Sequence, residues 1–164
     1  MIPKDQFLKA MGAFPSGVTI VTTTDADGQW RGFTASAFCS VSADPPLVLV
    51  CLADSADCHA AFQAAGRWNI HIVDAAHTEL AMRFARRGAE KFAGDDFVAD
   101  AHGIPQLRDA FVTLHCARHA CYPGGDHSIL VGQVGAAEIT DSAPVYYYRR
   151  GFHPVAEGAV QAAE

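Results

Sequence analysis

The amino-acid sequence predicts a mainly β protein, built as an antiparallel barrel with a few helices around it. Its 164 residues are enough for one domain with a full hydrophobic core. Short apolar and β-branched runs recur between clusters of Gly, Pro and Asp, which is typical of strands separated by turns. Hairpins outnumber strand–helix–strand units, and this favours an antiparallel barrel over a doubly wound parallel sheet.

The first elements are a helix and a β-hairpin. Apolar residues recur at helical spacing between Pro3, which suits the first turn of a helix, and Pro15, which ends it. The β-branched run 17–24 predicts a strand. The turn at 25–28 then sends the chain back as a hairpin partner, which is expected to continue past Thr34.

The middle of the chain mixes strands with short helices. A continuous apolar run at 47–52 predicts a strand buried on both faces. A helix is expected at 57–65 with Ser55 as its N-cap, then a strand at 68–73 and a helix at 78–87 stopped by Gly88. An irregular connection at 90–108 follows. The chain then forms a strand at 111–121, a turn at 122–126, the hairpin partner of that strand at 127–138, and a last strand at 145–148. We expect a single domain over 1–156, followed by a disordered tail at 157–164.

Composition and charge argue against several functional classes. The formal net charge of -6 and the lack of a basic stripe argue against nucleic-acid binding. No apolar run is long enough to span a membrane, and the N-terminus lacks an apolar signal segment. The five cysteines are odd in number and form no Cys-x-x-Cys pair, which predicts reduced thiols in a cytoplasmic protein.

Metal and nucleophile chemistry find little support in the sequence. His115, His119 and Cys121 share one strand face by period two, but no helical His pair or Cys-x-x-Cys accompanies them, so we expect no metal. Cys58 falls in the first turn of a predicted helix, where a thiolate could be favoured, yet a buried, inert thiol is the commoner state. Hydrolase and Rossmann motifs are absent.

Residues 32–42 combine small hydroxyl and methyl side chains along a predicted strand. A strand of this kind lets a flat ligand lie close to the backbone, whose N–H and C=O groups can then bind it. The same pattern fits an edge strand with a solvated Thr/Ser face. The segment alone favours neither interpretation.

Two further motifs suit a phosphorylated ligand. Arg83, Arg86 and Arg87, followed by Lys91, are expected to share one helical face that could receive phosphates, although a solvated basic face explains them equally well. The helix start after Ser55 offers free N–H groups, although simple capping is the commoner role. In the segment 124–127, two glycines permit close approach to a ligand and His127 begins a strand, although an ordinary hairpin turn is the plainer interpretation.

Together these segments resemble the short-chain flavin reductase family, whose members include the reductase components of two-component flavin-dependent monooxygenases. The resemblance covers nearly the whole chain, and it rests on the order and spacing of several motifs. The segments that carry it are 14–23, 32–38, 42–50, 55–59, 83–85, 91–94, 124–127 and 147–149. One departure is Trp68-Asn69-Ile70-His71, which stands where the family often has Phe-x-Val-Asn.

The resemblance implies a split antiparallel β-barrel of the FMN-binding type, a homodimer, and hydride transfer from NADH or NADPH to FMN or FAD. The implied cofactor-binding residues are Thr34, Ala35, Ser36, Ala37, Ser40, Ser42, Ala53, Ser55, Arg83, Phe84, Ala85, Lys91, Phe92, Gly125 and Tyr148. Residues 34–37 would line the isoalloxazine, and Ser55 would lie near the ribityl chain or phosphate. Residues 83–85 and Lys91 would close the phosphate side. His127, the implied catalytic residue, would face the nicotinamide pocket.

Hydride transfer to a flavin needs little acid–base help from the protein, which suits a chain without an evident nucleophile. His127 would therefore position the nicotinamide rather than donate a proton, and the reduced flavin would pass to a partner monooxygenase. The alternative is a split-barrel electron carrier that holds flavin without nicotinamide turnover. A remoter one is an oxidase of a pyridoxamine phosphate-like amine. The Gly-Gly-Asp-His turn favours the reductase, because it supplies a pocket for a second substrate.

Overall fold

The structure, a computed structural model, describes residues 1–155. The predicted tail at 157–164 lies outside them. The helices are α1 (Lys4–Met11), α2 (His59–Ala64) and α3 (Thr78–Ala85), with a 3-10 turn at Ala75–His77. The strands are β1 (Ser16–Gly17), β2 (Thr19–Thr24), β3 (Trp30–Ala35), β4 (Phe38–Ala43), β5 (Pro46–Ala53), β6 (Arg67–Ile72), β7 (Phe97–Ala99), β8 (Pro105–Leu107), β9 (Val112–Gly124), β10 (His127–Ile139), β11 (Val145–Tyr148) and β12 (Gly151–Pro154).

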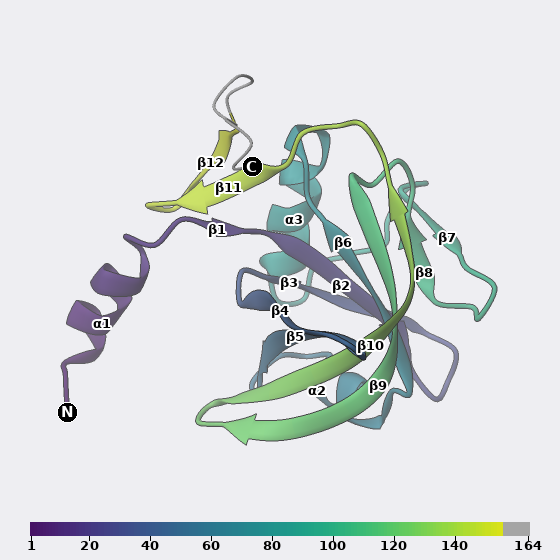
Figure 1. Cartoon of the computed structure of the whole chain (residues 1–164), viewed down its shortest axis with the longest axis horizontal. Helices are drawn as coiled ribbons and strands as arrows, with labels where there is room; N and C mark the ends of the chain where they lie inside the picture. The colour runs from purple at the N-terminus through teal and green to yellow at the C-terminus, as the bar shows by residue number, and fades with distance from the viewer. Residues whose placement is uncertain (156–164) are drawn as a thin grey trace.

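Seven strands form one curled antiparallel sheet in the order β3-β2-β6-β9-β10-β5-β4 (Figure 1). The long β9–β10 hairpin lies near its centre. At one edge β3 also contacts β5, although the two are not neighbours in the hydrogen-bonded order. The sheet therefore curls toward closure without completing a ladder. The predicted barrel is confirmed in its split form.

The segment 32–42 is not one strand, as the sequence suggested, but two. β3 ends at Ala35 and β4 begins at Phe38, and these strands form opposite edges of the sheet. The link Ser36–Ala37 is exposed and crosses the split between them. Ala37 accepts a hydrogen bond from Cys51 N, at 3.0 Å, so the crossing is anchored to β5. Period-two patterning continues across the break, which hides it in the sequence.

Two hydrophobic cores lie on either side of the sheet. The inner core fills the barrel, and α2 closes it with Phe62, whose ring meets Phe33 edge-on at 4.9 Å. The outer core lies under α3, where Leu80 and Phe84 are buried. α3 covers β3 and β2, so it holds the edge of the sheet beside the split.

Two predicted burial and capping details are wrong. β5 is not buried on both faces: Val48, Val50 and Leu52 face the core, while Leu47 and Leu49 are only half-buried. Both faces of this strand carry apolar residues, so its alternation cannot be seen in the sequence. Ser55 is not an N-cap either, because α2 begins at His59 after a turn and has no side-chain cap.

The cationic helical face also differs from the prediction. α3 ends at Ala85, so among the arginines only Arg83 belongs to the helix. Arg86 is already extended, with ψ at 137°. Gly88, the predicted stop, adopts a positive φ of 65° three residues beyond the helix end. The three arginines therefore do not share one helical face: Arg86 and Arg87 line the cleft described below, and Arg83 does not.

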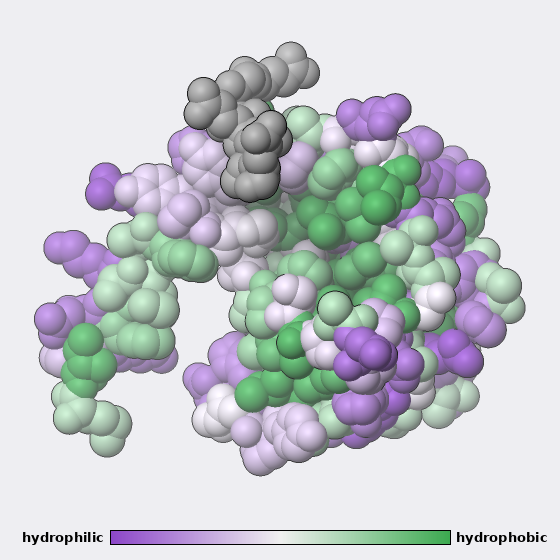
Figure 2. Space-filling model, in the orientation of Figure 1, coloured by the Kyte–Doolittle hydropathy of each residue, from purple (hydrophilic) through white to green (hydrophobic). Residues whose placement is uncertain are grey.

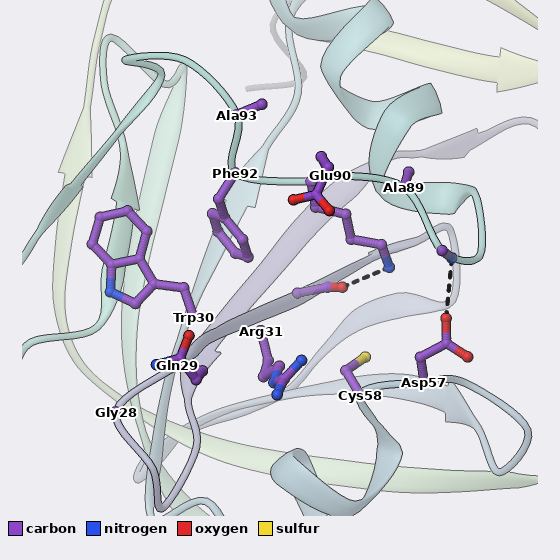
Figure 3. A pocket seen from close by; sticks show the side chains of 13 residues that line it. Gly28, Gln29, Trp30, Arg31, Asp57, Cys58, Ala89, Glu90, Phe92 and Ala93 are labelled. Carbon is purple, nitrogen blue, oxygen red and sulfur yellow. Dashed lines mark hydrogen bonds between the residues drawn. The ribbon is translucent and has the colours of Figure 1, made fainter.

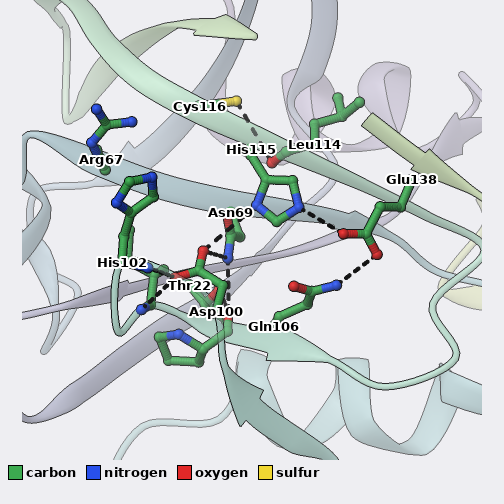
Figure 4. A network of polar contacts seen from close by, with 12 residues as sticks. Thr22, Arg67, Asn69, Asp100, His102, Gln106, Leu114, His115, Cys116 and Glu138 are labelled. Carbon is green, nitrogen blue, oxygen red and sulfur yellow. Dashed lines mark hydrogen bonds and ion pairs between the residues drawn. The ribbon is translucent and has the colours of Figure 1, made fainter. Parts of the chain in front are cut away.

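The connection predicted as irregular contains the hairpin β7–β8, and β12 pairs with β11 beyond the last predicted strand. A polar network ties the β7–β8 hairpin to the outer face of the sheet (Figure 4). Asn69 donates to Asp100 at 2.9 Å, and the His115 ring lies 3.5 Å from Asp100 and 3.2 Å from Glu138. These hydrogen bonds add to the apolar packing of Phe97 and Leu107, which belong to the outer core.

α1 stands apart from the barrel in Figure 1 and buries none of its residues. The predicted helix is present, yet its apolar side chains Phe7, Leu8 and Met11 are exposed, as is Phe14 beyond it. Figure 2 shows hydrophobic (green) surface on the α1 segment at the left, with an open gap between much of this segment and the body of the molecule. No helix within residues 1–155 has the length and apolar character needed to cross a membrane.

Candidate functional site

A cleft of about 290 Å³ opens where β3 ends, and it gathers segments that lie far apart in the sequence. Its first wall is the end of β3 with the link Ser36–Ala37. Its second wall is the turn after β5 together with His127 at the start of β10. The segment that follows α3 borders both.

The first wall is made of small residues and is held from behind by α3. Thr34 donates its hydroxyl to Ala81 O at 2.5 Å, so this side chain points to the helix. A Cβ at Gly32 would lie 2.6 Å from the Phe84 ring, so only glycine lets the helix approach this closely. Beyond it, Ser36 and Ala37 are exposed and line the cleft.

The second wall joins two turns. Ala53 pairs with His127 in the β5–β10 ladder, and Asp54 N donates to Asp126 O at 3.0 Å. His127 Nδ1 lies 2.7 Å from Asp126 Oδ1. This hydrogen bond lowers the pKa of Asp126, so the carboxylate is ionised and can only accept. Nδ1 therefore carries the proton, which leaves Nε2 of His127 available to a ligand.

Cations concentrate on the segment after α3. Arg86, Arg87 and Lys91 all line the cleft, against one acidic neighbour, Asp57. Arg87 donates to Ser55 O, and Gly88 N donates to Asp57 Oδ2 at 3.3 Å, so this segment is fastened to the second wall. A local excess of positive charge in an acidic chain is suited to phosphate.

A larger hollow of about 680 Å³ adjoins the cleft, and both include Asp57 and Lys91 (Figure 3). Lys91 Nζ donates to Gly32 O at 3.0 Å, which joins the loop to β3. Trp30 and Phe92 pack edge-on at 5.6 Å on one side of this hollow. A ligand longer than a single ring system therefore has room to extend from the cleft.

Thiol chemistry is not favoured here. Cys58 lies in the adjoining hollow but is buried, and this burial raises the pKa of its thiol. The thiolate that a nucleophile needs is thus disfavoured. Within residues 1–155, no group of three or more His, Cys, Asp or Glu side chains is placed to hold a metal ion.

The structure brings most of the sequence-predicted site residues together. Those lining the cleft are Thr34, Ala35, Ser36, Ala37, Ala53, Ser55, Phe84, Ala85, Lys91 and His127. Phe92 lines only the adjoining hollow and packs on Phe84 at 5.0 Å.

Five predicted residues line neither hollow. Ser40 and Ser42 lie on the edge strand β4, which the split separates from β3. Arg83 bonds Ala93 O at 2.9 Å and lines a different surface hollow, with Phe152. Gly125 lies in the turn before His127, and Tyr148 lies on β11.

Some cleft residues were not among the predicted ones. They are Phe33, Cys51, Leu52, Ala56, Asp57, Arg86 and Arg87. The two arginines carried a usable signal, because the cationic cluster was visible in the sequence. Leu52 and Cys51 looked like ordinary residues of an apolar strand, and nothing in the sequence marks Asp57.

Comparisons with known proteins place the chain in a family. The family model described as a flavin reductase like domain matches residues 11–156. Actinorhodin polyketide dimerase of Streptomyces coelicolor is 43% identical over 92% of this chain and 85% of its own length. NADH:riboflavin 5'-phosphate oxidoreductase of Streptomyces pristinaespiralis is 41% identical over 90% of this chain and 85% of its own length.

Two further matches bear on chemistry and partners. The reductase component of a 4-nitrophenol 4-monooxygenase/4-nitrocatechol 2-monooxygenase from Rhodococcus opacus is 39% identical, over 92% of this chain and 80% of its own length. A solved structure of NADH:FAD oxidoreductase from Streptomyces globisporus C-1027, in complex with NAD and FAD fragments, has a TM-score of 0.89 at 33% identity. That match covers 96% of this chain and 95% of the other.

Proposed function

Because the chain belongs to the flavin reductase family, we propose that it transfers hydride from NADH or NADPH to FMN or FAD, and that the reduced flavin serves a partner monooxygenase. The observation that carries the proposal is the cleft. It joins a wall of small residues, three cations and His127, which come from distant parts of the sequence.

The residues of the cleft fit a flavin nucleotide. Ala35, Ser36 and Ala37 carry side chains small enough for a flat ring to approach their backbone. Arg86, Arg87 and Lys91 supply the positive charge that a phosphate requires. A bound flavin accepts the hydride, so the protein need only bind and orient the two nucleotides in a dry cleft.

His127 is proposed to position the nicotinamide. Asp126 holds Nδ1 of its ring at 2.7 Å, which fixes the ring and leaves Nε2 to donate to or accept from a ligand. The side chain is about half exposed, so it is accessible to a second substrate.

A turnover assay tests the proposed function. With NADH and excess FMN or FAD, the protein should consume many equivalents of NADH, which is followed by the loss of its near-ultraviolet absorbance. A protein that turns yellow, is reduced once and then stops would instead be an electron carrier.

The variant His127→Ala should raise the KM for NADH by about tenfold, because an orienting contact is lost. The dissociation constant of FMN should change less than twofold. His102→Ala is the matched control, because His102 lies outside the cleft and should leave both constants unchanged. Unchanged kinetics in His127→Ala would remove the proposed role.

We also propose a homodimer, supported by apolar side chains that a single chain leaves uncovered. Phe7, Leu8 and Met11 of α1 are exposed, and Leu47 and Leu49 on the outer face of β5 are half-buried. A second copy of this chain is the proposed occupant of the apolar surface on α1.

A cytoplasmic location stays a prediction, supported by five cysteines that are all free thiols.

A further inference from the structure

A cluster of four polar side chains lies behind the second wall of the cleft, and none of them belongs to the predicted site. Ser128 donates its hydroxyl to Asp54 Oδ1 at 3.1 Å and receives a hydrogen bond from Gln63 Nε2 at 2.7 Å. His59 Nε2 lies 2.9 Å from Ser128 Oγ and 3.1 Å from Asp54 Oδ1.

This Ser128 cluster (Asp54, His59, Gln63 and Ser128) is not a nucleophilic triad. In a triad the carboxylate holds the imidazole nitrogen opposite the serine. Here Asp54 and Ser128 share the same nitrogen of His59, and the serine itself donates to the carboxylate. The Ser128 hydroxyl therefore donates its proton to the Asp54 carboxylate, and no base of this cluster is placed to activate it as a nucleophile.

The cluster connects three elements that meet at the cleft. Ser128 is on β10, directly after His127, and Asp54 directly follows Ala53 at the end of β5. His59 and Gln63 come from α2, whose preceding turn carries Ser55 and Asp57. The cluster thus fixes the β5 turn against the hairpin that carries His127.

The first wall is held by different contacts. Thr34 is bonded to Ala81 of α3, and Lys91 is bonded to Gly32 of β3. None of these residues takes part in the Ser128 cluster. The segment after α3 contacts both walls, through Arg87 and Gly88 on one side and Lys91 on the other. The Ser128 cluster itself joins only elements of the second wall, so a change in the cluster should act on that wall more strongly than on the first.

We propose that Ser128 and Asp54 are positioning residues that set the KM for the reduced nicotinamide by fixing His127 relative to the β5 turn. The inference rests on the proposed function, because it assigns the second wall to the nicotinamide. Ser128 is 6% exposed and donates its hydroxyl to Asp54. Losing this hydroxyl would leave the Asp54 carboxylate with only its contact to His59 Nε2 at 3.1 Å within the cluster, so the β5 turn would be held less firmly against the hairpin.

The test compares four variants by steady-state kinetics with NADH and by FMN binding. Ser128→Ala should raise the KM for NADH by about tenfold and leave the FMN dissociation constant within about twofold. Asp54→Ala should do the same, and because the Asp54 side chain is 49% exposed, this variant should fold even if Ser128→Ala does not. Ser128→Thr keeps the hydroxyl and should retain most of the wild-type KM.

Ser142→Ala is the matched control. Ser142 also donates to a carboxylate, Asp74, at 2.9 Å, but neither residue lines the cleft. It should leave the KM unchanged whatever its effect on thermal stability.

Wild-type turnover with unchanged KM in both Ser128→Ala and Asp54→Ala would overturn the inference and leave the proposed function standing. Parallel losses of NADH and FMN affinity would also overturn it. A wild-type protein that does not turn over NADH would overturn both.

Discussion

At the scale of single residues, the clearest case is a buried histidine with a structural role. His71 lies on β6 and is fully buried, with its ring between Ile20 of β2 and Leu107 of β8. Leu107 N donates to its Nε2 at 3.1 Å, so Nδ1 carries the proton and donates to Ile20 O at 3.0 Å. The neutral ring satisfies both neighbours, and burial lowers the pKa of His71 to about 4. An amide side chain at this position could hold one donor and one acceptor in the same way.

The titration of His71 predicts a loss of stability in mild acid. The ordinary pKa is 6.5 and the folded value is about 4, so between these values the unfolded state binds more protons. The free energy of unfolding should therefore fall as pH drops through this window, by about 3 kcal/mol at most. Asp74 and Asp100, whose pKa values are lowered from 3.8 by hydrogen bonds, lose most of their stabilising contribution at lower pH, mainly below about pH 4.

Urea unfolding at pH 7 and at pH 4.5 measures this effect. His71→Asn keeps a donor and an acceptor without a titrating ring, so its free energy of unfolding should depend less on pH across this range. An equally steep dependence in the variant would assign the acid sensitivity to other groups.

At the scale of elements, the sequence predicts the hairpins well and the breaks poorly. The turn at 25–28 and the glycine pair before His127 mark their hairpins, because turn geometry requires particular residues. The break at Ser36–Ala37 carries no such signal, since a strand can leave one edge of a barrel and join the other without Gly or Pro. The two arginines of the cleft were seen as a charge cluster but placed on a helix that ends before them.

The close contact between β3 and α3 predicts that Gly32→Ala destabilises the fold. Its Cβ would lie 2.6 Å from Phe84 Cε1 and 3.0 Å from Val21 O. The Phe84 ring is 1% exposed and packs on Phe92 and Phe97, so it cannot move aside freely. Overpacking of this kind costs about 1–3 kcal/mol.

Thermal unfolding measures the loss of stability in Gly32→Ala. FMN binding should weaken in this variant as well, because α3 would be displaced and it holds Thr34 of the first wall. Gly66→Ala is the control, since nothing lies within 4 Å of its Cβ. Equal stability of Gly32→Ala and Gly66→Ala would contradict the prediction, because it would mean that α3 can shift to accept the added methyl group at no cost in stability.

At the scale of the whole molecule, the unpartnered α1 is the feature that a single chain does not explain. An eight-residue helix is marginal in water by itself, and most helical stability in proteins comes from packing of an apolar face. Leu8 is 55% exposed and Phe14 72% exposed. Within residues 1–155 the apolar face of this helix packs on nothing, which supports the homodimer proposed above.

A second copy seated against α1 would cover this face, so Leu8→Glu should weaken self-association by about tenfold or more, because a charge would replace an apolar contact at the interface. Sedimentation velocity over a concentration series measures the dissociation constant. Gln6→Glu introduces the same charge on a polar position of the same helix and should leave the constant close to that of the wild type. A wild-type chain that stays monomeric at micromolar concentration, or a Leu8→Glu variant that associates as well as Gln6→Glu, would rule out α1 as the dimer contact.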